Sequence, residues 1–246
     1  MMSFERAPGI GAEPAPAPVP PSGTTTTDAV SPAMRLQILS TEHWSLLASR
    51  SLAWNESFSR AGMFLATLTG AIVGLALVAQ ASAFGDAFTL FALVILPIVL
   101  FIGVATFIRL GASNYHDALC VIGMNRIRAA YLELAPDLER YFVMSAHDDA
   151  RGAAITRGVP PGGGAMPLAH LIAATPAVVL ILNALLAGII TALVALRAGG
   201  GASAIFGVGL LGFLVAMALQ SVYARRNIAK VSSLMRPIFP TPVADR

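Results

Sequence analysis

Charged residues are scarce in this chain of 246 residues, and their scarcity excludes most soluble folds. Only 12% of the residues are Asp, Glu, Lys or Arg, whereas 56% are hydrophobic. A soluble domain of this size carries about a quarter charged residues to cover its surface. The composition therefore indicates that much of the chain has lipid as its solvent.

Cysteine and catalytic motifs are lacking as well. The single cysteine, Cys120, excludes a secreted scaffold held together by disulfides. No nucleophile motif or phosphate-binding loop occurs, because the Gly-rich stretches are not followed by Lys-Ser or Lys-Thr. Neither His116 nor His147, each next to aspartate, has the spacing of a zinc site. We therefore predict no catalytic residue, no metal site and no cofactor, and we expect that the protein is not an enzyme.

Four long segments contain no charged residue and no histidine. Because a helix rises about 1.5 Å per residue, roughly 20 apolar residues cross a bilayer core about 30 Å thick. Only short connections separate the first segment from the second and the third from the fourth. We therefore predict an all-α integral membrane protein with four transmembrane helices in two hairpins. The four segments are residues 61–79, 88–108, 171–196 and 202–222.

Basic residues near the ends of these segments lie almost entirely on one side. Cytoplasmic ends of membrane spans carry an excess of Lys and Arg. On the opposite side lies Arg197 alone. We therefore predict a bacterial inner, or plasma, membrane protein with cytoplasmic N- and C-termini, and its net charge of +3 requires no nucleic-acid partner. The basic residues on the cytoplasmic side are Arg50, Arg60, Arg109, Arg157, Arg225, Arg226, Lys230 and Arg236.

The segments between the spans complete the predicted organisation. Pro- and Thr-rich composition predicts disorder, periodic apolar residues predict an amphipathic helix, and Gly-rich composition predicts a linker. In order along the chain, the predicted parts are a disordered tail (1–32), an amphipathic juxtamembrane helix (33–60), transmembrane hairpin 1 (61–108), a cytoplasmic helical segment with a Gly-rich linker (109–169), transmembrane hairpin 2 (170–222) and a basic cytoplasmic tail (223–246).

The only two tryptophans, Trp44 and Trp54, lie in the amphipathic helix before the first span. The tryptophan ring favours the membrane interface because it is amphipathic. One interpretation makes both residues interface anchors of a helix that lies along the inner membrane surface. In the other interpretation, the apolar stripe of the same helix packs on the cytoplasmic middle segment.

The spans also lack ionisable residues, which argues against proton-coupled or ion-coupled transport. Their polar side chains include the amides Asn183 and Gln220. We interpret Asn183 as an interhelical hydrogen-bonding residue, worth about 0.6–2 kcal/mol in membrane hosts. A pore-lining or substrate-contacting role is the alternative. Pro97, at the centre of the second span, removes a helical hydrogen bond and predicts a kink.

Small residues recur every four positions on two of the spans. Such stripes let helix backbones approach closely in lipid. They suit packing within one chain and equally contacts between copies in a homo-oligomer. The stripes consist of Gly62, Ala66, Gly70 and Gly74 on the first span and of Ala184, Gly188 and Ala192 on the third.

The stretch from Thr41 to Gln80, TEHWSLLASRSLAWNESFSRAGMFLATLTGAIVGLALVAQ, resembles the opening of a group of uncharacterised bacterial multi-pass inner-membrane proteins without assigned activity. The similarity continues to about Asp149. The order of cytoplasmic helix, transmembrane hairpin and helical extension is also loosely similar to two-helix membrane effector modules, which are proposed pore formers. This chain differs from those modules by its second hairpin.

The sequence thus predicts a membrane scaffold or sensor subunit with a cytoplasmic helical collar. An oligomeric pore or channel-type assembly is the alternative that the second resemblance implies. The expected partners are the lipid bilayer, further copies of the chain and a cytoplasmic protein.

Overall fold

The computed structural model describes residues 30–159, 175–234 and 236–242, and every regular element in these ranges is helical. The predicted tail at 1–32 and the predicted linker after residue 159 lie almost entirely outside the described residues. Four of the helices are long and apolar enough to cross a membrane. The elements are α1 (Pro32–Ser82), α2 (Asp86–Leu134), the 3₁₀ helix η1 (Pro136–Tyr141), α3 (Ala150–Thr156), α5 (Thr175–Arg197) and α6 (Ala202–Leu234).

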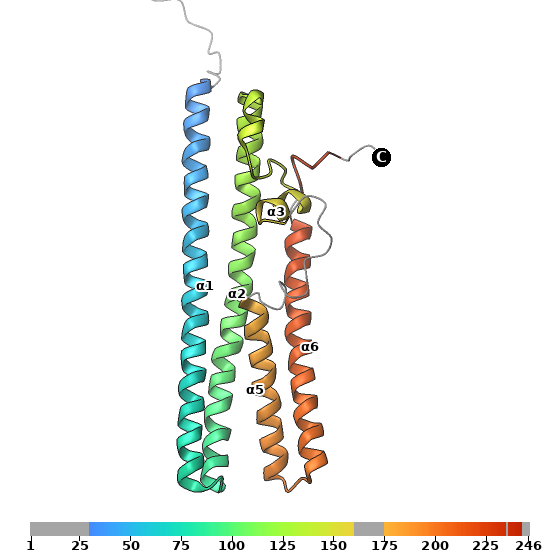
Figure 1. Ribbon diagram of the computed structural model, residues 1–246. Coiled ribbons are helices and arrows are strands. Elements are labelled where there is room, and N and C mark those ends of the chain that lie inside the picture. Colours follow the sequence, from blue (N-terminus) through green and yellow to red (C-terminus); the bar gives the residue numbers. More distant parts are fainter. Residues whose placement is uncertain (1–29, 160–174, 235, 243–246) are drawn as a thin grey trace, which may run out of the picture.

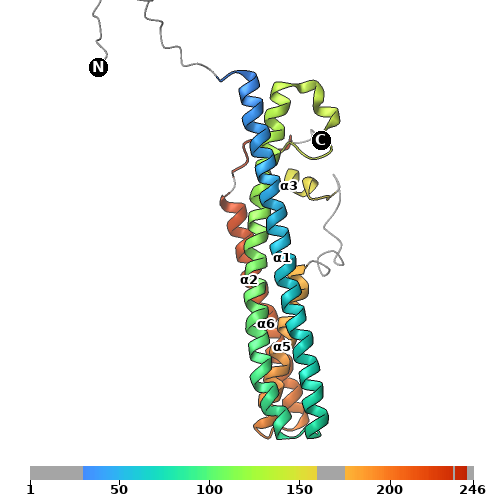
Figure 2. The same ribbon diagram turned by 90° about the vertical axis from the view of Figure 1, so that its left-hand side faces the viewer.

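The two long helices α1 and α2 lie side by side along their whole length (Figure 1). They contain 51 and 49 residues, so each is about 75 Å long, more than twice the thickness of a bilayer core. Ser31 caps the start of α1, because its side chain accepts a hydrogen bond from the Met34 N–H at 3.3 Å. Figure 2 shows the two helices crossing at a shallow angle.

The predicted amphipathic helix at 33–60 is the first half of α1, because this helix runs without a break into the apolar segment. Likewise, α2 continues past residue 108 as far as Leu134. One pairing register joins the two helices from end to end, since Ser57 meets Ser113, a Cβ on Gly103 would meet the Phe64 ring, and one on Gly74 would meet the Phe91 ring.

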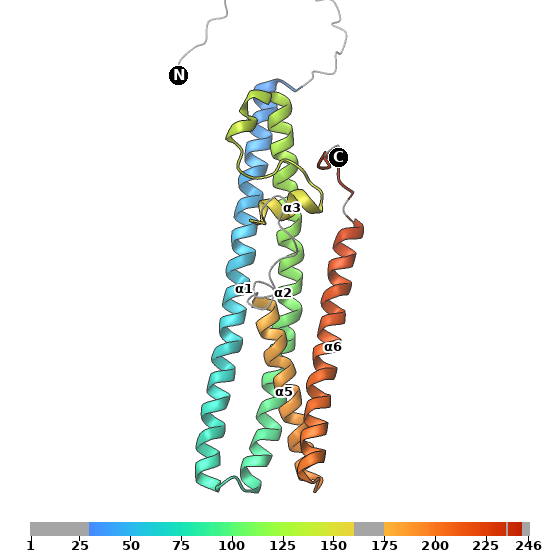
Figure 3. The same cartoon turned by 45° about the vertical axis from the view of Figure 1, so that its right-hand side comes forward.

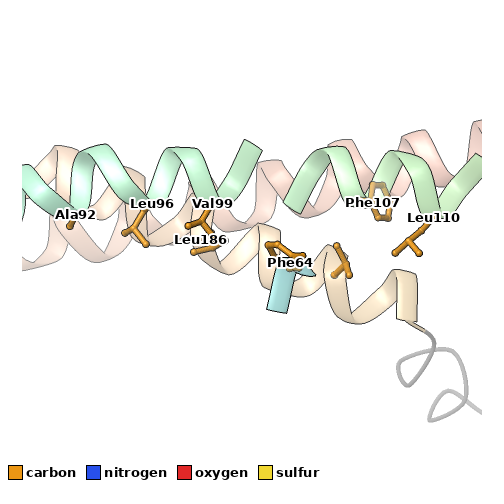
Figure 4. Close-up of a cluster of buried hydrophobic side chains, with 8 residues drawn as sticks. Phe64, Ala92, Leu96, Val99, Phe107, Leu110 and Leu186 are labelled. Atoms are coloured by element: carbon orange, nitrogen blue, oxygen red, sulfur yellow. The ribbon is translucent and has the colours of Figure 1, made fainter. Parts of the chain in front are cut away.

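The helices α5 and α6 form a second closely packed pair. Gly188 and Gly209 allow this approach, because a Cβ on Gly188 would lie 2.9 Å from the Gly209 carbonyl oxygen. Helix α5 also packs on α2, whereas α6 has few contacts with α2 (Figure 3). A shared apolar core joins the pairs (Figure 4), with Phe64 from α1, Leu96 and Val99 from α2, and Leu186 from α5.

The connections within the two pairs lie at the same end of the molecule (Figure 1). An ion pair links them, since Arg197 Nη1 at the end of α5 lies 2.6 Å from Asp86 Oδ1 at the start of α2. In the turn between α1 and α2, Ala83 and Phe84 have positive φ angles of 47° and 59°. Left-handed backbone costs a residue with a Cβ about 1–2 kcal/mol.

Candidate functional site

Beyond the apolar segments, the helices form a region that we call the collar. It comprises the first half of α1 up to residue 60, α2 from residue 109, η1, α3, and the extended residues 236–242, which we call the C-terminal strap. A small apolar cluster lies inside it, where Leu46 of α1 and Ala153 of α3 pack against Val121 and Met124 of α2. The collar carries most of the polar contacts between elements that are distant in sequence.

Asp117 on α2 is the electrostatic centre of the collar. The residue is buried, with 7% exposure. Its Oδ1 accepts hydrogen bonds from Arg50 Nε at 2.6 Å and from Trp54 Nε1 at 3.0 Å, and its Oδ2 accepts one from Arg157 Nε at 3.1 Å. Because Arg50 and Trp54 are four residues apart, they lie on the same face of α1. One carboxylate therefore fastens α1 and the end of α3 to α2.

These partners determine the protonation state of Asp117. Burial acts to raise the pKa of its carboxyl, but the hydrogen bonds from Trp54 and Arg50 and the charges of Arg50 and Arg157 outweigh burial and lower the pKa. A carboxylate held ionised in this way is a poor general acid or base at neutral pH. Asp117 thus acts as a structural counter-charge.

Two adjacent aspartates hold the C-terminal strap. The carboxylate of Asp148 accepts hydrogen bonds from Arg126 Nε at 2.7 Å and from the backbone N–H groups of Ile238 and Phe239 at 2.9 and 2.8 Å. Asp149 accepts hydrogen bonds from the N–H and hydroxyl of Thr241, each at 2.9 Å. The strap is thus fastened through backbone donors as well as side chains.

Asp149 also caps α3, because its Oδ1 accepts a hydrogen bond from the Gly152 N–H at 2.7 Å. Burial acts to raise the pKa of both Asp148 and Asp149, yet the hydrogen bonds that their carboxylates accept lower it. A negative charge on each is therefore favoured at neutral pH.

Asn125, which is fully buried, joins the loop before α3 to α2. Its Nδ2 donates to the His147 carbonyl at 2.7 Å, and its Oδ1 accepts from Arg128 Nη1 at 2.7 Å and from Thr156 Oγ1 at 2.8 Å. Burial, and then the charge of Arg50, lower the pKa of Arg128. The loop and α3 are thus positioned by one amide.

The side chains near both histidine motifs have structural partners. His116 lines a cavity of about 400 Å³ between α1 and α2, together with Glu56 and Arg109, whereas its neighbour Asp117 faces Arg50. The carboxylate of Glu56 lies 2.6 Å from Arg109 Nη2 and 2.8 Å from Arg60 Nε. Hydrogen bonds from these two arginines lower the pKa of Glu56. Within the described ranges, no group of three or more His, Cys, Asp or Glu side chains is placed to hold a metal ion.

The small-residue stripe of α5 is used within the chain. Ala184 is fully buried. Gly188 contacts Gly209 and Phe213 of α6, and a Cβ on Gly209 would lie 3.0 Å from the Cβ of Ala192. Gly188 and Ala192 therefore bring α5 close to α6.

The stripe of α1 is mostly directed away from the rest of the chain. Gly62, Ala66 and Gly70 are exposed, and a Cβ added to Gly62 or Gly70 would meet no described atom within 4 Å. Gly74 differs, because its Cβ would lie 3.8 Å from the Phe91 ring. Packing inside the chain therefore accounts for only one end of this stripe.

Asn183 lies where α1, α2, α5 and α6 come together. Its Nδ2 donates to Gln220 Oε1 at 3.1 Å, and the Gln220 amide in turn donates to the Ala216 carbonyl at 3.2 Å. Asn183 Oδ1 is buried and has no hydrogen-bond partner among the described residues. This oxygen points at Gly103, where a Cβ would overlap it. The Asn183 and Gln220 amides thus form a contact between α5 and α6. At the other predicted position, Pro97, α2 remains helical on both sides of the proline.

The two tryptophans have different surroundings. Trp54 bonds Asp117 and also contacts the Phe58 ring, with 5.7 Å between ring centroids. Trp44 is 67% exposed. Ala61 lies 17 positions further along the continuous helix, which corresponds to about 25 Å along α1. In this stretch Leu46 packs on the α2 cluster, whereas Leu47 of the apolar stripe is 39% exposed.

Sequence reasoning missed the residues that assemble the collar, above all Asp117, Asn125, Asp148 and Asp149. A partial signal existed in the spacing of Arg50 and Trp54, which places two donors on one helical face. Nothing in the sequence pairs that face with Asp117. Comparison with protein-family models, with curated proteins and with solved structures finds no match for this chain.

Proposed function

We propose that the chain is a scaffold or sensor subunit of a bacterial inner membrane, which binds a cytoplasmic protein through its collar. In this proposal α1 with α2 and α5 with α6 form two transmembrane hairpins, and the collar and both termini face the cytoplasm. The distribution of arginine supports this orientation. Arg50, Arg109 and Arg157 lie in the collar, whereas Arg197 at the opposite end is paired with Asp86.

The observation that carries the proposal is an apolar stripe on the collar half of α1. The stripe remains 39–67% exposed although its helix packs on α2 through Leu46 and although Trp54, at the edge of the stripe, bonds Asp117 of α2. Exposed apolar side chains that follow one helical face are typical of a protein-binding surface. The stripe consists of Leu36, Trp44, Leu47, Trp54 and Phe58.

Site-specific photo-crosslinking in cells tests this proposal. A photoreactive amino acid at Leu47 should capture a protein of constant mass, while the same amino acid at Ser45, which is exposed on another face of α1, should not. If both positions capture the same mixture, or if neither captures a second protein, the scaffold proposal is wrong.

The alternative is an oligomeric pore or channel-type assembly, and the outward stripe of Gly62, Ala66 and Gly70 favours it. Gly70→Leu should then dissociate the oligomer in detergent and abolish ion flux in liposomes. Gly207→Leu is the matched control, because that glycine of α6 also has open space around it. A wild-type protein that passes no ions or small solutes after reconstitution would exclude the pore.

A further inference from the structure

A second cavity, of about 550 Å³, lies between α2, α3 and α6. It is placed where three of the apolar segments end, because Phe107, Pro176 and Tyr223 contribute to its wall. Cavities of about 300–1,000 Å³ with a mostly apolar lining and a few polar groups are the usual form of small-molecule sites in proteins. The position and size therefore suit an amphipathic ligand.

The apolar part of the lining lies toward the spans. The rings of Phe107 on α2 and Tyr223 on α6 have centroids 6.0 Å apart. Helix α6 packs mainly on α5 and touches α2 little (Figure 3). One close approach occurs at Gly111, where a Cβ would lie 3.5 Å from Asn227 Nδ2. The lining thus follows a poorly packed seam between α2 and α6.

The polar part of the lining lies toward the collar. It includes the amides of Asn114 and Asn227 and the guanidinium of Arg157. Asp117 uses the Nε donor of Arg157, and a guanidinium has four further N–H donors, which suit phosphate oxygens.

The acidic residues of the lining are engaged elsewhere. Asp148 and Asp149 bind the backbone of the C-terminal strap, and Pro237 of the strap is itself part of the wall. The strap therefore occupies acceptor positions of the two carboxylates, and Pro237 closes the cavity on the collar side.

From this arrangement we infer that the cavity binds a phospholipid of the cytoplasmic leaflet. The lipid phosphate lies toward Arg157, and an acyl chain runs along the seam between α2 and α6 beside Phe107 and Tyr223. This inference rests on the proposed membrane location.

Photolabelling in vesicles tests the inference. The full chain is reconstituted in phosphatidylethanolamine and phosphatidylglycerol with a trace of phosphatidylethanolamine that carries a diazirine near its glycerol. Labels should concentrate on the cavity-lining segments around residues 107–122 and 223–228, above the level on the outer face of α6. Equal labelling of the two surfaces would overturn the inference.

Variants that fill the cavity make the test specific. Gly111→Leu should reduce labelling about tenfold, because overpacking against the ligand costs about 1.4 kcal/mol or more. Ala224→Leu fills the same cavity from α6 and should act likewise. The control Gly207→Leu, outside the cavity lining, should label like the wild type. Unchanged labelling in both cavity variants would show that the lipid lies elsewhere.

Two further outcomes separate the sources of error. Excess free glycerol 3-phosphate should leave labelling unchanged. If it abolishes labelling, the natural ligand of the cavity is a soluble phosphate compound and the phospholipid inference is wrong. If cell fractionation finds the chain in the soluble fraction, the proposed function fails together with this inference. A membrane-bound chain without concentrated labelling contradicts this inference alone.

Discussion

Replacing Asp117 by asparagine removes one charge from the collar with almost no change in side-chain size. The Asn amide oxygen can accept the bonds from Arg50 and Trp54 that Asp117 Oδ1 accepts now. The amide nitrogen would face Arg157 Nε with donor against donor, so the bond that holds the end of α3 is lost. We therefore expect Asp117→Asn to loosen α3 and the collar more than the apolar core.

The magnitude follows from the kind of bond and its exposure. A hydrogen bond to a charged group contributes about 1.5–3 kcal/mol. The side chains of Arg50 and Arg157 are 24% and 35% exposed, so water compensates part of the loss. We expect collar opening to become easier by about 2 kcal/mol, which corresponds to a roughly 30-fold larger open population.

Cys120 provides the assay, because it is the only cysteine and lies one turn after Asp117 with 1% exposure. Its rate of thiol labelling, normalised to the rate in the unfolded chain, reports the open population when reclosing is faster than labelling. Asp117→Asn should therefore be labelled about 30-fold faster than the wild type.

Asp86→Asn is the matched control. Asp86 also pairs with an arginine, but its side chain is 87% exposed at the opposite end of the molecule. Its loss should change stability by less than about 0.5 kcal/mol. If Asp117→Asn leaves the Cys120 rate unchanged, or if Asp86→Asn raises it equally, the charges around Asp117 do not hold the collar closed.

Three further predictions concern pH, a close helix contact and the first turn. Because the pKa of Asp117 is lowered in the folded chain, its ionised carboxylate stabilises the fold fully above the unfolded pKa of about 3.9, and this stabilisation is lost as the pH falls through the folded pKa. Trp54 fluorescence should therefore be constant from neutral pH to about pH 4. A fluorescence transition near neutral pH would contradict this prediction. Gly103→Ala should destabilise the fold by about 1–3 kcal/mol in thermal unfolding. Gly62→Ala, where the added Cβ meets open space, should be neutral or stabilise the fold by up to about 1 kcal/mol. Equal effects of the two substitutions would show that the close contact at Gly103 does not limit stability. Ala83→Gly should raise the free energy of unfolding by about 0.5–1 kcal/mol, since it relieves a φ of 47°, and a decrease in denaturant titrations would show that the turn is not strained.

The apolar helices could be predicted from the sequence because the absence of charged residues over about 20 positions is a simple signal. Their full extent could not. The pattern around residues 33–60 suits a helix on a membrane surface and equally a helix packed on protein. The position of α2 accounts for Leu46, which packs on the cluster around Val121 and Met124, whereas the stripe residues such as Trp44 and Leu47 remain exposed.

The two small-residue stripes are a second case in which the sequence pattern does not determine what a helical face contacts. Gly62, Ala66 and Gly70 have the same spacing as Ala184, Gly188 and Ala192, yet the first group is exposed, whereas Ala184 is buried and Gly188 and Ala192 face α6. The difference arises because Phe64 and Leu68 of α1 belong to the core. Spacing identifies a smooth helical face, but the neighbouring bulky residues determine which way it turns.

The polar contacts of the collar were beyond sequence reasoning for a different reason. Asp148 and the strap are about 90 residues apart, and a carboxylate among loop residues looks solvated in sequence. Only the fold supplies the burial and the backbone donors through which Asp148 and Asp149 hold the C-terminal strap.

The unbroken register of α1 and α2 has a mechanical consequence. Because each helix runs from the collar through its apolar segment without an intervening loop, we expect a displacement of the collar to be transmitted along both helices toward the turn at Ala83. The α5 and α6 pair is coupled to that motion through the apolar core that it shares with α1 and α2, through the strap held by Asp148 and through the ion pair of Arg197 with Asp86. In this arrangement the α1 and α2 pair would carry a motion from the collar to the opposite end of the molecule, and the α5 and α6 pair would move with it.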